Sequence, residues 1–166
     1  MMHHQQKELN VITAFIEEIG IDIIYTALNE PCFLPGLKLY RGRILVDKSK
    51  LQYPGDLLHE AGHIAVTLEA QRPLIGTPEM PEDWPSAGDE IVTILWSYAA
   101  LQKLNLAPEV VFHENGYKNQ SKWLIEQFES KNYIGLPLLT WMGLCHESNN
   151  EDSSVPAFPK MIKWLR

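Results

Sequence analysis

The chain has 166 residues, 45% of them hydrophobic and 21% charged, so one domain over residues 1–166 can bury a substantial core. Its 21 acidic and 14 basic residues give a formal net charge of −7, which repels nucleic-acid phosphates and anionic membrane surfaces. We therefore expect neither nucleic acid nor a membrane as a partner.

The cysteine content and the apolar stretches predict a cytoplasmic protein. Cys32 and Cys145 are too few for a disulfide-built scaffold. The first ten residues contain no apolar signal core. The longest nearly apolar stretch, residues 91–101, is shorter than the roughly 20 residues needed to cross a bilayer.

The first predicted element is an amphipathic helix. Apolar residues recur at helical spacing from Val11 to Ile19, and Gly20 ends the pattern. Residues 21–28 are apolar without a clear period, so strand and helix both remain open for this segment.

A β-hairpin is predicted next. Residues 37–40 and 43–46 are short runs of strand-forming character on either side of Arg41 and Gly42. Two-residue turns favour glycine because it readily takes a positive φ.

Two helices joined by a long loop follow the hairpin. Asp56 is placed to cap a helix that runs to about Leu68. Residues 71–88 contain four prolines and two glycines, an unusually long connection of the kind that often covers a functional site. Residues 89–101 predict a second, almost wholly apolar helix.

The remaining chain predicts shorter helices and one loop. Proline stands in the first turn of three of these helices, where its missing amide hydrogen costs least. The predicted helices lie near residues 108–114, 121–131, 137–145 and 159–166, and the loop covers residues 149–154.

The helix after Asp56 contains the motif HExxH, formed by His59, Glu60 and His63. Histidines four residues apart share one helix face, where both imidazoles can reach a single Zn²⁺. Glu60 lies about 60° around the helix from His63, so it can act as general base on a water held by that metal. The flanking residues are apolar or small, and metal coordination would remove the cost of burying these polar groups. The alternative is two core histidines bonded to backbone carbonyls, with Glu60 in an ion pair.

A catalytic zinc needs a third protein ligand, and three acids compete for this place. Glu69 lies ten residues after His59, but on a continuing helix it would point about 120° away from His63. Glu90 opens the second helix, where it begins a polar stripe with Thr93 and Ser97. Asp89 could also bind the metal, although a helix start favours a capping role for it.

These residues resemble a zincin metallopeptidase of the gluzincin arrangement. The resemblance covers about a quarter of the chain and implies His59, His63 and Glu90 as zinc ligands and Glu60 as base and proton shuttle. The hairpin before the motif also resembles small intracellular zinc peptidase domains associated with repressor cleavage, in which an edge strand precedes the active-site helix. Two features depart from these patterns: Val66 replaces the glycine that metzincins place before their third ligand, and Asp89 precedes Glu90 where some gluzincins have asparagine.

We therefore expect a mostly helical α+β protein with a zincin-like core, in which a small antiparallel sheet lies beside the HExxH helix and a second helix carries a ligand. The favoured function is that of a zinc-dependent hydrolase. The favoured class of hydrolase is a metallopeptidase, which would act on a peptide or protein. Two alternatives remain: a non-catalytic, zinc-stabilised binding or regulatory module, and a metal-free structural domain. By residue type alone, four side chains are candidate donors to a developing oxyanion. They are Tyr98, His113, Tyr117 and His146.

Overall fold

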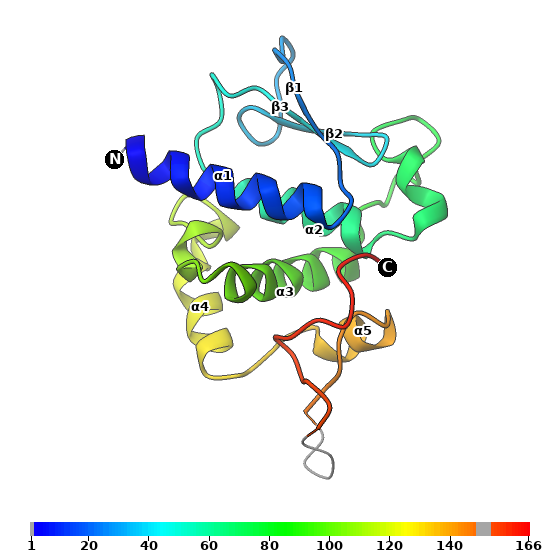
Figure 1. Cartoon of the computed structure of the whole chain (residues 1–166). Helices are drawn as coiled ribbons and strands as arrows, with labels where there is room; N and C mark the ends of the chain where they lie inside the picture. Colours follow the sequence, from blue (N-terminus) through cyan, green and yellow to red (C-terminus); the bar gives the residue numbers. More distant parts are fainter. Residues whose placement is uncertain (1, 149–153) are drawn as a thin grey trace.

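The computed structural model describes residues 2–148 and 154–166, and it has an α+β architecture. A small sheet lies over helices α1 (Met2–Glu18) and α2 (Asp56–Val66), and α3 (Ala87–Leu104) runs on the far side of α2 (Figure 1). No helix in the described part of the chain is long and apolar enough to cross a membrane.

Helix α1 confirms the amphipathic pattern and begins well before it, at Met2. Ile12, Phe15 and Ile16 are buried against the rest of the core. The helix gives way to a turn at Gly20, whose φ of +94° is unfavourable for residues with a side chain.

The sheet consists of β1 (Ile23–Tyr25), β2 (Leu37–Tyr40) and β3 (Arg43–Val46), in the order β1-β3-β2. Strands β2 and β3 form the predicted hairpin, and Arg41 and Gly42 both have positive φ in the turn. Strand β1 pairs with β3 in parallel, so the sheet is mixed and the expectation of an antiparallel sheet was wrong. Because residues 21–28 show no alternation, their pattern carried no sign of this pairing.

Helices α2 and α3 pack tightly at Gly62. A Cβ atom on Gly62 would lie 2.9 Å from the Thr93 side chain and 3.2 Å from Trp96, so only glycine allows this approach. Leu57 of α2 and Trp96 of α3 are both fully buried. The close packing brings the HExxH motif face to face with the first turns of α3.

Helix α2 ends at Val66, two residues earlier than expected, because the chain becomes extended at Thr67. Its N-cap residue is Gly55 and not Asp56, and no side chain caps its amides. A 3-10 helix, η1 (Glu69–Leu74), follows, so the long loop is shorter than predicted.

The C-terminal part matches the predictions less well. Helix α4 (Ser121–Glu129) lies within its predicted segment, and α5 (Leu136–Trp141) begins one residue before its predicted segment and ends four residues before the end of that segment. The helix expected at 108–114 is reduced to the 3-10 turn η2 (Pro108–Val110), and a second such turn is η3 (Tyr117–Asn119). All but residue 154 of the loop predicted at 149–154 lies outside the described residues.

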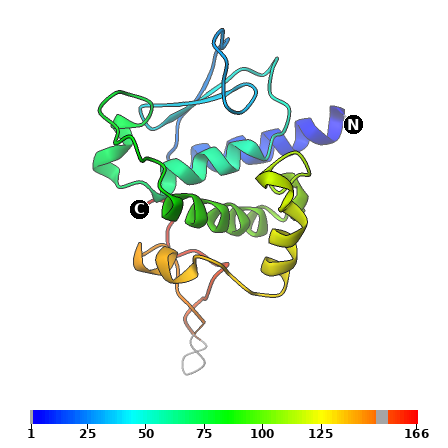
Figure 2. The ribbon, with the colours of Figure 1, turned by 180° about the vertical axis from the view of Figure 1, so that it is seen from behind.

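The prediction of a helix at residues 159–166 was wrong. These residues pass α5 and end beside α2 (Figure 2), where the Arg166 amide donates to the Ala65 carbonyl. The Trp164 carbonyl accepts a hydrogen bond from the Trp96 indole. Tertiary contacts of this kind take up backbone groups that a helix would pair internally.

Candidate metal centre

The two histidines of the motif project from one face of α2. His59 and His63 bring their Nε2 atoms to 3.0 Å from each other, and their rings meet edge to face. Both are largely buried, with 13% of the His59 side chain and 7% of the His63 side chain exposed. Two imidazole nitrogens held so close, away from water, favour a shared cation between them.

Glu90 reaches the same point from the first turn of α3. Ser86 caps this helix: its hydroxyl accepts from the Asp89 amide, and the Asp89 carboxylate accepts from the Ser86 amide. This capping box fixes the first turn, in which Glu90 is the next residue. Glu90 Oε1 lies 3.3 Å from His59 Nε2, and Oε2 lies 3.2 Å from His63 Nε2.

The spacing of these ligand atoms fits Zn²⁺. Bonds of about 2.0–2.1 Å at tetrahedral angles place neighbouring ligand atoms about 3.3 Å apart. The nitrogen–nitrogen and nitrogen–oxygen distances here are 3.0, 3.2 and 3.3 Å. Within the described residues, His59, His63 and Glu90 form a group whose potential ligand atoms all lie within 4.8 Å of one another. The residues present therefore suit a three-ligand site.

The outer nitrogen of each imidazole also has a partner. Thr93 Oγ1 lies 3.4 Å from His63 Nδ1, and the Tyr117 hydroxyl lies 3.1 Å from His59 Nδ1. Such contacts fix the orientation of metal-binding histidines and direct their Nε2 atoms inward. The polar stripe on α3 faces α2 as its sequence indicated, because Ser97 Oγ also lies 3.5 Å from the Leu58 carbonyl oxygen.

The two glutamates of the site differ in pKa. Hydrogen bonds with His59 and His63 hold the pKa of Glu90 well below its usual value, so it stays ionised. Burial raises the pKa of Glu60, although the two imidazoles oppose this shift. Glu60 is therefore the more basic carboxylate, which suits a proton acceptor beside a ligand.

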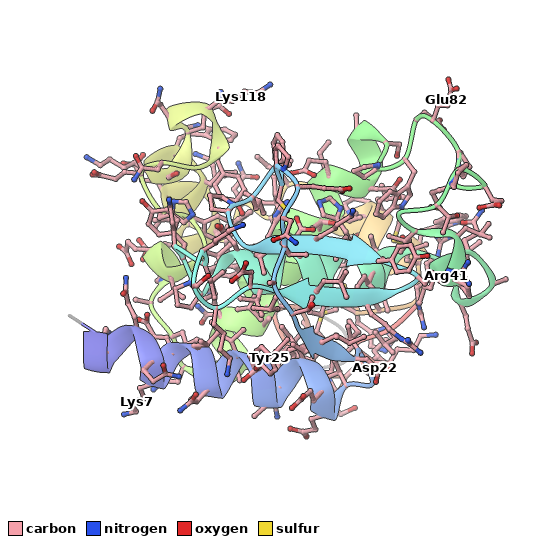
Figure 3. All side chains as sticks on the ribbon, turned by 90° about the horizontal axis from the view of Figure 1, so that it is seen from above. Lys7, Asp22, Tyr25, Arg41, Glu82 and Lys118 are labelled. Carbon is pink, nitrogen blue, oxygen red and sulfur yellow. The ribbon has the colours of Figure 1, made fainter. Side chains whose placement is uncertain are left out.

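These residues line a cavity of about 930 Å³. One part of the lining is apolar and comes from β2 and the segment before it, and another part is mostly polar and comes from residues 113–118. Seen from above, Lys118 of this lining lies on the side of the molecule opposite Lys7 of α1 (Figure 3). The lining residues are Phe33, Leu34, Pro35, Leu39, Gln52, Tyr53, Asp56, His59, Glu60, His63, Trp84, Pro85, Glu90, His113, Asn115, Gly116, Tyr117 and Lys118.

The other two candidate ligands stand outside this group. The Asp89 carboxylate is engaged in the capping box of α3. Glu69 begins η1, beyond the extended residue Thr67, and is exposed. Neither belongs to the group of ligand atoms around His59 and His63.

Of the four candidate oxyanion donors, the structure brings Tyr117 to the histidines. Tyr98 is buried among other aromatic rings, and His146 is exposed outside the cavity lining. His113 lines the cavity, but its Nε2 contacts Asp56 at 2.9 Å. Its Nδ1 is buried and has no hydrogen-bond partner in the described part of the chain, so neither ring nitrogen is presented to a ligand.

Two contributions to the cavity were not predicted. Asp56 was expected to cap α2 but contacts His113, and Tyr53 stacks on the His113 ring with centroids 3.8 Å apart. No periodicity links Tyr53 or Asp56 to His113, because each lies more than 50 positions from it in the chain. The spacing of residues within one helix therefore could not reveal these contacts with His113.

Comparison of the chain with protein-family models, with curated proteins and with solved structures found no match. The chemistry of this site is therefore argued from its own geometry.

Proposed function

We propose that the chain is a zinc-dependent hydrolase with a zincin-like core, in which His59, His63 and Glu90 hold the metal and Glu60 is the general base. The observation that carries this proposal is the convergence of the two imidazole Nε2 atoms and the two Glu90 carboxylate oxygens, with neighbouring atoms 3.0 to 3.3 Å apart, on a cavity that Glu60 also lines. A catalytic zinc site combines three protein ligands with an open position for water or substrate.

Zinc, when bound, supplies a Lewis acid and lowers the pKa of a coordinated water to about 7. The Glu60 carboxylate then accepts a proton from the attacking water and donates it to the leaving group. Burial favours this role because it raises the pKa of Glu60 above its ordinary value, which makes the carboxylate a better proton acceptor. Before any metal binds, hydrogen bonds with His59 and His63 already lower the pKa of Glu90, so its carboxylate is in the ionised form that a metal ligand requires.

The shape of the cavity favours a peptide or protein segment as substrate. Its volume is near the upper end of the range for small-molecule pockets, and its lining combines apolar with polar side chains. The outer edge of β2 is partly covered, because the Arg41 amide donates to the Ile75 carbonyl and Gly76 lies against Leu39 O. We therefore expect cavity side chains to hold the substrate, without strand pairing along β2.

The first test is the zinc content of purified protein. We expect about one zinc per chain in the wild type, and loss of zinc in His63→Ala and Glu90→Ala. The matched control is Glu69→Gln, which removes an exposed acid from outside the site and should keep the zinc. A wild type that binds no zinc even after zinc is added would overturn the metal centre.

The second test separates catalysis from binding. Glu60→Gln should retain zinc but lose at least about 100-fold in the hydrolysis of a mixed fluorogenic peptide library. If the library is cleaved by the wild type and cleaved equally by the variant, the role of Glu60 is wrong. If zinc is bound but no peptide is cleaved, a zinc-stabilised binding module is the better description.

A further inference from the structure

One exposed side chain in the cavity lining differs from the rest of the exposed apolar surface. Phe33 is 100% exposed, whereas the other exposed large hydrophobic side chains of the described residues range from 37% to 73%. Phe33 lines the cavity of the proposed metal centre, and none of those other side chains does. A single exposed apolar residue on an open surface needs no explanation. A phenylalanine that no neighbour covers, in the lining of a cavity, can bind an apolar group that enters the cavity.

The loop that carries Phe33 is held firmly at both ends. The chain leaves the sheet after β1 and returns to it at β2 through this loop (Figure 1). Asp47 binds the residue on each side of the loop segment 29–35. Its carboxylate accepts from the Leu28 amide at 3.0 Å, and its own amide donates to the Gly36 carbonyl at 2.8 Å. Gly36 is also enclosed, since a Cβ atom there would lie 2.6 Å from the Leu51 nitrogen.

Few contacts hold the loop between these two ends. In the part of the chain that the structure describes, no amide hydrogen of residues 29–33 has a hydrogen-bond partner. Glu30 pairs with Lys38 at 3.1 Å, but both side chains are exposed, and such a pair contributes little. Residues of the loop line two hollows, the cavity of the metal centre and a second one of about 460 Å³. A loop with fixed ends and few contacts of its own can change position as a unit.

The cavity also has a fixed aromatic surface beside a proposed metal ligand. The Trp84 indole nitrogen donates to Thr67 Oγ1 at 3.1 Å, and the Thr67 hydroxyl donates to the His63 carbonyl at 2.7 Å. The Trp84 ring meets the His63 ring edge to face, with centroids 5.9 Å apart. Trp84 lines the cavity as well. An apolar side chain of a ligand bound near His63 can therefore lie against Trp84 without any movement of the indole.

We propose that residues 29–35 form a flap that closes on the substrate, and that Phe33 on this flap selects substrates with an aromatic or large aliphatic side chain. On closing, Phe33 covers this side chain, and Trp84 supports it from the cavity lining. The driving force is the removal of two apolar surfaces from water, one on Phe33 and one on the substrate. A substrate without such a side chain gives closure no gain. This inference rests on the proposed metal centre and names the substrate class of that site.

Two ligands that differ by one phenyl group test the selection. Propionohydroxamate and 3-phenylpropionohydroxamate share the same metal-binding group, and their dissociation constants are measured on the zinc-loaded protein. In the wild type the phenyl compound should bind at least about tenfold more tightly, and this ratio should fall at least about threefold in Phe33→Ser. Trp141→Ser changes a 73% exposed side chain outside the cavity lining and should keep the wild-type ratio.

Hydrogen exchange tests the movement of the flap. The amides of residues 29–33 have no partner within the described residues, so they should exchange rapidly in the protein without ligand. The phenyl compound should slow exchange over residues 28–36 at least about fivefold, because closure shields these amides from water. Propionohydroxamate should leave the exchange unchanged, and in Phe33→Ser neither compound should slow it.

The outcomes distinguish a failure of this inference from a failure of the proposed function. A wild type that binds no zinc overturns the metal centre itself. A zinc-loaded wild type that binds the two hydroxamates equally, or binds neither, overturns the selection of an apolar side chain. If the preference for the phenyl compound is undiminished in Phe33→Ser, Phe33 is not the selecting residue. If the phenyl compound leaves exchange over residues 28–36 unchanged, the loop does not close.

Discussion

Asp56 and His113 lie 57 positions apart in the chain, yet their side chains meet at 2.9 Å between Oδ1 and Nε2. Asp56 begins α2, the helix of the HExxH motif, and His113 begins the segment that carries Tyr117. Tyr53 covers the other side of this pair by stacking on the imidazole. The pair therefore connects residues 113–118 of the cavity lining to the helix that carries two of the proposed metal ligands.

Removing His113 should loosen this connection. His113→Ala leaves the buried Asp56 carboxylate without its partner, so the free energy of unfolding should fall by about 1–3 kcal/mol. Urea denaturation provides the measurement. The control is Lys122→Ala, which removes an exposed ion pair with Glu114 and should change stability by less than about 1 kcal/mol. Equal stability of His113→Ala and the wild type would show that the pair does not support the fold.

Relieving the backbone strain at Lys118 should stabilise the protein. Lys118 has a φ of +51°, and glycine adopts this conformation without a Cβ clash. Lys118→Gly should therefore raise the free energy of unfolding by about 1 kcal/mol. Glu126→Gly, an exposed substitution within α4, should lower it by about the same amount. A fall in melting temperature for Lys118→Gly would contradict the assignment of strain.

Zinc should stabilise the folded state. Because the ligand atoms converge only in the folded chain, free zinc at 100 times its dissociation constant should add about 2.7 kcal/mol. Thermal unfolding with and without a chelator measures this effect. In His63→Ala the two melting curves should coincide, and a persisting zinc effect there would place the metal elsewhere.

The Phe33 side chain should affect substrate binding and leave the stability of the fold unchanged. Its side chain is 100% exposed, yet it belongs to the apolar part of the cavity lining. Phe33→Ser should leave the free energy of unfolding within about 0.5 kcal/mol of the wild type and reduce cleavage of peptides with bulky apolar residues. Trp141→Ser, at a 73% exposed position outside the cavity lining, is the matched control. If Phe33→Ser has the same peptide preference as the wild type, the apolar part of the lining does not belong to the substrate site.

Asp47 should make stability depend on pH. Its pKa is lowered first by the Ser49 hydroxyl and next by the Leu28 amide, both of which donate to its carboxylate. Since the folded pKa lies below the unfolded one, this stabilisation is present above an unfolded pKa of about 3.9 and is lost as the pH falls through the folded value.

Asp47→Asn should accordingly melt at a lower temperature than the wild type at pH 7. The difference should shrink in acid, once the wild-type carboxyl is protonated in both states. Melting curves from pH 7 to pH 2 test this expectation. A difference that stays constant over the whole range would mean that the charge on Asp47 is not responsible.

Local patterns in the sequence were enough to predict much of what surrounds the site. The period of α1, the hairpin around Arg41 and Gly42, and the helix of the HExxH motif each follow from residues close together in the chain. The same holds for the shared face of His59 and His63, because a spacing of four residues determines it within a single helix. Glu90 could be proposed as a partner only because it begins a polar stripe on an apolar helix.

The tertiary structure decided which distant groups meet. The parallel pairing of β1 with β3, the contact between Glu90 and both histidines, and the placement of Tyr117 against His59 all join separate elements. None of these contacts produces a sequence period, since each depends on how helices and loops pack. The predicted helix at 159–166 failed for the same reason: there the backbone pairs with α2, and side chains such as Trp164 pack individually into the core. Local sequence thus determined the helix that carries His59 and His63, and long-range packing brought Glu90, Thr93 and Tyr117 against these histidines.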